Sequence, residues 1–128
     1  MISKLSRNVQ IAGMNREELK ARIKAFALRV MKMTDALPGN GKGKVIANQI
    51  FRSATAVASG YRAACRARSK ADWIDKIGRV LEEADESLLW LELTEEGEIL
   101  PPRRIASLKR EAAELSAIFA AIHKSSKS

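Results

Sequence analysis

Apolar residues recur every three or four positions along most of the chain, which is the period of an α-helix that packs on one side. The first such stretch begins after Asn15, a favourable N-cap, and stops at the turn Pro38-Gly39-Asn40-Gly41. Its apolar positions are Leu19, Ile23, Phe26, Val30, Met33 and Leu37. The pattern therefore predicts a helix over about 16–37.

Three further stretches have the same period. The second covers about 42–68. The third follows the candidate N-cap Ser69 and runs to about 96, and the fourth opens at Pro101-Pro102 and runs to about 124. Their apolar positions are Ile46, Ile50, Ala54, Val57, Tyr61 and Cys65, then Trp73, Ile77, Val80, Ala84, Leu88 and Leu91, then Ile105, Leu108, Ala112, Leu115, Phe119 and Ile122.

No stretch alternates as a strand would, and the connections are short enough to make neighbouring helices antiparallel. We therefore predict an all-α fold, an antiparallel up-down-up-down four-helix bundle over residues 15–124. Residues 1–14 are expected to form a mobile N-terminal tail, or to precede a start at Met14, and residues 125–128 a frayed C-terminal tail.

The chain of 128 residues fits one domain, and its 46% hydrophobic content argues against disorder. Its one cysteine excludes an internal disulfide and favours a reducing, cytoplasmic location. No apolar run is long enough for a membrane span, and the N-terminus lacks the apolar region of a signal peptide. We expect no membrane association.

The net charge of +8 is unevenly distributed: +12 over residues 1–70, −8 over 71–100 and +4 over 101–128. Such a charge distribution suits either a basic face for a polyanion or complementary faces for self-assembly.

The strongest candidate for function is the second helix, because no acidic residue occurs from Lys42 to Lys70. Helical spacing places most of its cations opposite the apolar stripe. Lysine and arginine on such a face bind phosphate backbones and release condensed counterions. The candidate nucleic-acid-binding residues are Lys42, Lys44, Arg52, Arg62, Arg66 and Lys70. A solvated face, or one paired with carboxylates elsewhere, is the alternative.

Catalytic and metal-binding chemistry is poorly supported. Cys65 reads as a small core residue, and the one histidine, His123, lies close to the C-terminus. The glycine-rich turn before the second helix lacks the spacing of a phosphate-binding loop, because Pro38 and Val45 occupy two of its defining positions. We therefore predict a protein that is not an enzyme and has no catalytic residues, cofactor or metal.

Four apolar residues lie away from the core-facing stripes. They are Phe51, Leu89, Trp90 and Leu93. Exposed apolar clusters usually mark an interface, so we predict that these residues contact another copy of the chain. Partial burial under neighbouring helices is the alternative.

Three segments, 49–57, 61–73 and 81–93, resemble the four-helix-bundle family of 23S ribosomal RNA intervening-sequence proteins of bacteria. The resemblance covers about residues 19–122 and departs at Gly60, where members more usually carry Asn. It implies a four-helix bundle assembled as a homopentamer, with no established enzymatic activity. A related group serves the reverse transcriptase of diversity-generating retroelements and is thought to bind nucleic acid through a basic surface.

Two functions remain open. The first is an oligomeric module that binds RNA or DNA through its backbone with little sequence specificity. The second is a protein-interaction scaffold, such as an accessory subunit of a reverse transcriptase or another nucleic-acid enzyme, that binds no nucleic acid itself.

Overall fold

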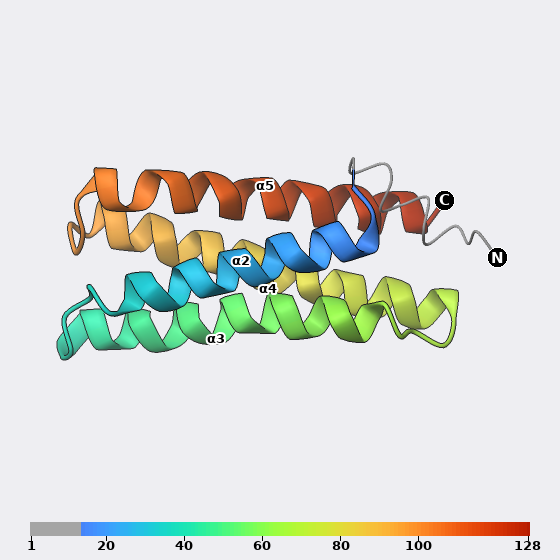
Figure 1. Ribbon diagram of the computed structural model, residues 1–128, viewed down its shortest axis with the longest axis horizontal. Helices are drawn as coiled ribbons and strands as arrows, with labels where there is room; N and C mark the ends of the chain where they lie inside the picture. The colour runs from blue at the N-terminus through green and yellow to red at the C-terminus, as the bar shows by residue number, and fades with distance from the viewer. Residues whose placement is uncertain (1–13) are drawn as a thin grey trace.

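The computed structural model describes residues 14–128, and these form four long helices. The helices are α2 (Arg16–Thr34), α3 (Gly41–Ala64), α4 (Lys70–Glu96) and α5 (Pro102–Ser126). Consecutive helices run antiparallel along one common axis (Figure 1), and the described part of the chain contains no strand. The predicted all-α four-helix bundle is confirmed.

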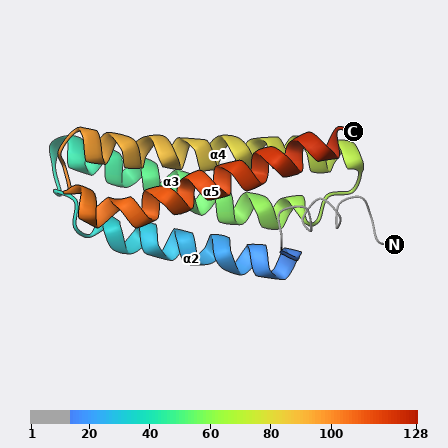
Figure 2. The same ribbon diagram turned by 90° about the horizontal axis from the view of Figure 1, so that it is seen from above.

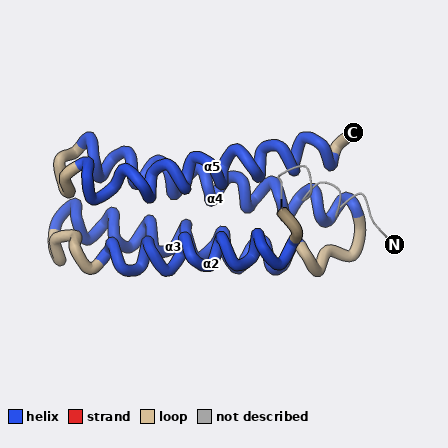
Figure 3. The backbone as a smooth tube through the Cα atoms, turned by 45° about the horizontal axis from the view of Figure 1, so that its top comes forward, coloured by secondary structure: helices blue, strands red, loops and turns tan. Residues whose placement is uncertain are grey.

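The helices are not equally well packed against one another. α4 packs closely on both α3 and α5, whereas α2 packs mainly on α3 and more loosely on α5 (Figure 2). The α2–α3 and α4–α5 loops lie at one end of the bundle, and the α3–α4 loop lies at the other end with the C-terminus (Figure 3). None of the four helices combines the length and apolarity of a membrane span.

The predicted helix starts are confirmed by their caps. The Asn15 side chain accepts a hydrogen bond from the Glu18 backbone N–H at 2.8 Å, and the Ser69 side chain accepts one from the Asp72 backbone N–H at 3.0 Å. Each bond satisfies an N–H that has no partner within the helix. Pro102 begins α5 at a position where its missing N–H costs nothing.

Two predicted boundaries differ from the structure. α3 ends at Ala64, four residues before the expected end at 68, because the backbone N–H groups of Arg66 and Ala67 turn back to the carbonyls of Ala63 and Ala64. α5 continues to Ser126, so the segment 125–128 predicted to fray begins inside a helix.

Ser126 is fully buried, and its hydroxyl accepts a hydrogen bond from the indole Nε1–H of Trp73 at 2.9 Å. Met14, the last residue of the predicted N-terminal tail, is partly buried and packs against the core. The prediction for residues 1–13 falls outside the described residues.

The core consists of the predicted apolar stripes. All six expected positions of α2 with its following turn and all six of α5 are buried. Cys65 and Leu88 are half-buried at the edges of the α3 and α4 stripes. At the end near the α3–α4 loop, Tyr61 forms ring contacts with Trp73 and Phe119 at centroid distances of 6.5 and 5.6 Å.

Gly60 allows α3 and α4 to approach closely. A Cβ atom at this position would lie 3.0 Å from Cγ2 of Val80, a fully packed core residue. A side chain at position 60 would therefore require Val80 to shift, so the close approach offers a packing reason for a glycine whose helix propensity is unfavourable by about 1 kcal/mol relative to alanine.

Candidate nucleic-acid interface

The α3–α4 loop and its flanking turns gather four exposed cations, which we call the basic end: Arg62, Arg66, Arg68 and Lys70. Within residues 14–128, no carboxylate side chain lies within 4.0 Å of any of these charged groups. Lys70 Nζ donates a hydrogen bond to the backbone oxygen of Ser128 at 3.4 Å. The four cations therefore form no ion pair with an acidic side chain of the described chain, although the Asp72 carboxylate attracts the charge of Arg68.

The carboxylate nearest in sequence, Asp72, is used for other contacts. It accepts hydrogen bonds from the ammonium group of Lys76 and from the backbone N–H of Arg68. These two bonds, the Lys76 bond first, lower the pKa of Asp72 from its ordinary value of 3.8. Asp72 therefore remains charged and fixes the loop, while the guanidinium of Arg68 stays exposed.

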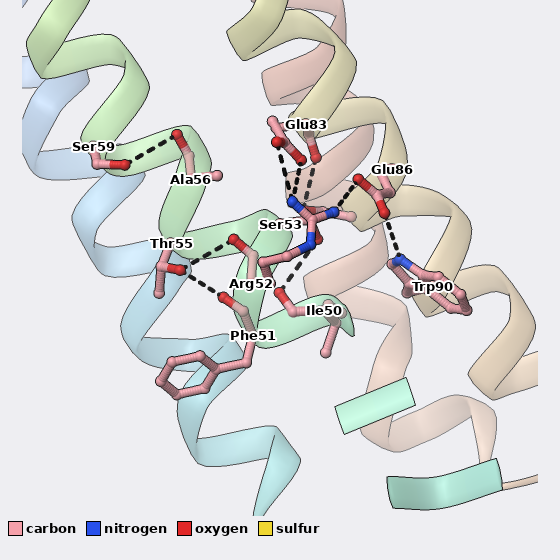
Figure 4. Close-up of polar contacts among 11 residues, drawn as sticks. Ile50, Phe51, Arg52, Ser53, Thr55, Ala56, Ser59, Glu83, Glu86 and Trp90 are labelled. Atoms are coloured by element: carbon pink, nitrogen blue, oxygen red, sulfur yellow. Dashed lines mark hydrogen bonds and ion pairs between the residues drawn. The ribbon is translucent and has the colours of Figure 1, made fainter. Parts of the chain in front are cut away.

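Arg52 was predicted to be available for phosphate binding, but in the structure its guanidinium is already paired. Its guanidinium lies 3.2 Å from Glu83 and 2.5 Å from Glu86, both on α4 (Figure 4). Arg52 therefore belongs to an ion-pair network that joins α3 to α4. The alternative of pairing with carboxylates elsewhere in the chain is confirmed for this residue.

The pKa values of the two carboxylates in this network shift in opposite directions. The hydrogen bond from Arg52 lowers the pKa of Glu86, whereas burial raises that of Glu83. Glu86 additionally accepts a bond from the indole Nε1–H of Trp90 at 3.3 Å. The network is half-exposed, and it orients Trp90 along the α3–α4 seam.

Lys42 and Lys44 lie far from the basic end. They stand in the first turn of α3, whereas Arg62 stands in its last turn, so Lys44 and Arg62 are separated by about 27 Å along the axis. Arg66 and Lys70 lie beyond the end of α3, where helical spacing no longer applies. Because α3 ends at Ala64, the basic face expected on the second helix does not continue along one helix to Arg66 and Lys70.

The four off-stripe apolar residues are also divided. Phe51 extends from α3 on the side of α2. Trp90 belongs to α4 and lies beside Glu86, on the other side of Arg52 (Figure 4). Leu89 and Leu93 are 47% and 42% exposed on the outer side of α4, and Phe51 is 42% exposed. Trp90 is half-buried, in agreement with the alternative of partial burial. The structure thus has two separate apolar surfaces.

Further exposed residues were not predicted from the sequence. Leu28, Met31 and Val45 are exposed, although they fall in regular helical patterns. Arg68 lies in the acid-free segment from Lys42 to Lys70, but helical spacing does not place it on the basic face. Counting cations in that segment, without assuming a helix, finds it.

Among residues 14–128, no metal site is assembled. No group of three or more His, Cys, Asp or Glu in that part of the chain is arranged to hold a metal ion. Cys65 and His123 share no hydrogen bond, and His123 instead packs against Gly78 of α4. The Gly41 backbone has a φ of 56°, and Gly43 lies tightly against Pro38, so this turn serves to reverse the chain.

The chain is similar to known proteins over most of its length. The family model described as 23S rRNA-intervening sequence protein matches residues 17–121. A crystal structure of a protein of unknown function from the S23 ribosomal protein family of Bacteroides thetaiotaomicron has 31% sequence identity and a TM-score of 0.76. The match covers 82% of this chain and 97% of that one. No curated protein matches the sequence.

Proposed function

Because the chain belongs to the family of 23S rRNA-intervening sequence proteins, we propose that it is a self-associating module that binds the phosphate backbone of nucleic acid. The observation that supports this proposal best is the basic end. Arg62, Arg66 and Arg68 are exposed and lie within seven residues, and none of their guanidinium groups forms an ion pair with a carboxylate of residues 14–128.

The chemistry of the basic end suits phosphate rather than bases. Guanidinium groups bind phosphate oxygens through paired N–H donors, and each contact releases counterions from the nucleic acid. The aromatic residues Tyr61 and Trp73 that lie nearest are fully buried, so they offer no stacking surface for bases. The expected binding is therefore strongly salt-dependent and nearly independent of sequence.

A filter-binding or fluorescence-anisotropy assay with ribosomal RNA fragments at low salt tests this proposal. The double variant Arg62→Glu/Arg66→Glu should bind at least about tenfold more weakly, because two phosphate contacts are replaced by repulsions. Both positions are exposed, so the fold should be retained, which circular dichroism checks.

The matched control is Lys24→Glu/Arg110→Glu, which makes the same change in net charge. Both residues are exposed on α2 and α5 and form no ion pair with residues 14–128. The control should retain most of the RNA affinity. Equal losses in the two double variants, or no binding by the parent protein at low salt, would remove the proposal.

The second candidate is a protein-interaction scaffold, and the exposed Leu89 and Leu93 on α4 favour it. In this account the cations of the basic end meet acidic faces of other subunits. Arg62→Glu/Arg66→Glu would then dissociate the assembly, as measured by light scattering. An intact assembly that has lost RNA binding supports the nucleic-acid module instead.

A further inference from the structure

The charged side chains along the seam between α2 and α5 are paired in one part and unpaired with carboxylates of residues 14–128 in another. In the middle of the bundle, Arg22 forms a bidentate pair with Glu111, with Nε–Oε2 and Nη2–Oε1 distances of 2.8 Å. Glu114 adds a longer contact to Arg22 Nη2 at 3.6 Å. This part of the seam has complementary charges.

Closer to the two loops, the same seam opens into a groove without any acidic lining residue. Its wall and floor residues are Arg29, Lys32, Met33, Arg104, Ser107 and Leu108. Arg29 Nη2 donates a hydrogen bond to the Ser107 hydroxyl at 2.8 Å. Within residues 14–128, none of its three cations forms an ion pair with a carboxylate.

Three like charges across one seam repel each other, and the repulsion is strengthened by the apolar floor. Met33 and Leu108 are only 8% and 5% exposed, so they lower the local dielectric beneath the cations. The first turn of α5 contributes the positive end of a helix dipole, and Pro101 supplies no side-chain cap for it. The groove therefore presents three exposed positive charges that form no ion pair with a carboxylate of residues 14–128.

We propose that this groove binds a phosphoryl group. Arg29 and Arg104 supply guanidinium donors from opposite helices, and Lys32 supplies an ammonium point charge. A bound anion would replace the repulsion across the seam with attraction and would join α2 to α5, which pack on each other less closely than the consecutive helices do. The phosphoryl group comes either from a nucleic-acid backbone or from a small phosphate compound.

The groove is independent of the basic end. It lies beside the α2–α3 and α4–α5 loops, at the opposite end of the bundle from the α3–α4 loop (Figure 3). Loss of RNA binding in Arg62→Glu/Arg66→Glu would therefore leave phosphate binding in the groove intact, and the two proposals can fail separately.

Thermal unfolding in inorganic phosphate, compared with chloride at equal ionic strength, tests the groove. At a phosphate concentration ten times the Kd, the parent midpoint should rise by about 4 °C. Arg104→Glu should unfold at a higher temperature than the parent in chloride, because it turns a repulsion into an ion pair. The same variant should lose the rise produced by phosphate.

Arg103→Glu is the matched control for this experiment. It lies in the same first turn of α5, makes the same charge change and gains the same dipole stabilisation, but it does not line the groove. It should keep the phosphate response. A phosphate response that survives in Arg104→Glu, or that disappears equally in Arg103→Glu, would overturn the proposal.

A second arm identifies the source of the phosphoryl group. The probe is a single-stranded 20-residue RNA without terminal phosphates, added to the Arg62→Glu/Arg66→Glu variant. Stabilisation that requires Arg104 supports a site for the nucleic-acid backbone. Stabilisation by inorganic phosphate alone supports a site for a small phosphate compound.

Discussion

Arg52 on α3 and Glu86 on α4 form an ion pair at 2.5 Å, and Glu83 completes the pairing of the guanidinium. Helical spacing places Arg52 opposite the apolar stripe of its helix. Its side chain nevertheless contacts carboxylates of the neighbouring helix. Surface position alone does not make an arginine available to a ligand, because its long side chain can cross a helix seam.

Arg52→Gln should therefore separate stability from binding. The variant should unfold at a lower temperature than the parent, because Glu83 and Glu86 would repel each other without the guanidinium between them. Its RNA affinity should change by less than about twofold, since it removes no available phosphate contact. Thermal unfolding and anisotropy on the same samples check both outcomes. A large loss of RNA affinity would return Arg52 to the binding surface.

Ser126→Ala should destabilise the bundle by about 1–3 kcal/mol, because it leaves the buried indole N–H of Trp73 without this acceptor. Urea unfolding measures the effect. In the Ser126→Ala/Trp73→Phe double variant, the cost should be smaller than the sum of the single costs, since both partners of the bond are removed. Fully additive costs would show that the bond contributes no coupling energy.

His123 should make the stability of the bundle depend on pH above the range in which carboxylates titrate. Burial, and then the charge of Lys127, lowers the pKa of His123 from its ordinary value of 6.5. The unfolded chain therefore binds the proton more readily, so stability is full above about pH 6.5 and decreases as the pH falls towards the lower folded pKa. Asp75 and Glu82 line the same groove between α4 and α5 but form no ion pair with His123.

The His123→Gln variant checks this prediction by urea unfolding between pH 7 and pH 5. Its stability should change less over that interval than the stability of the parent. A parent protein whose stability rises towards pH 5, or a variant with an unchanged slope, would contradict the assignment.

Leu89→Lys/Leu93→Lys should reduce the mass of any assembly in solution, as measured by light scattering, because it places two charges on the exposed apolar side of α4. Ala113→Lys/Ala117→Lys is the matched control, since both alanines are exposed on α5 with the same spacing. The control should keep the parent mass. Equal masses for all three proteins would exclude this side of α4 from the interface.

The fold was predictable from the sequence because each helix carries its own local signals. Asn15 and Ser69 act as caps in the structure as their residue types predict, and Pro102 and Gly97 mark the expected start and end. The end of α3 was not predictable in this way. Its last turns are rich in alanine and arginine, which favour helix, whereas backbone bonds to Ala63 and Ala64 terminate it.

The candidate sites were only partly predictable, since they depend on contacts between helices. The acid-free segment identified Arg62 and Arg66 correctly as exposed cations without carboxylate partners in the described chain. Periodicity could not show that Arg52 pairs with Glu86. It also could not bring Arg29 and Arg104 together, because they are 75 residues apart and meet only through the packing of α2 on α5.

The salt dependence of RNA binding tests the central claim most directly. If Arg62, Arg66 and Arg68 each contact a phosphate, RNA binding should weaken steeply as salt is added. In a plot of the logarithm of the association constant against the logarithm of salt concentration, the slope for single-stranded RNA should be about −2 or more negative. Arg62→Glu/Arg66→Glu should have a much shallower slope. A parent slope near zero, or equal slopes for parent and variant, would contradict backbone binding by the basic end.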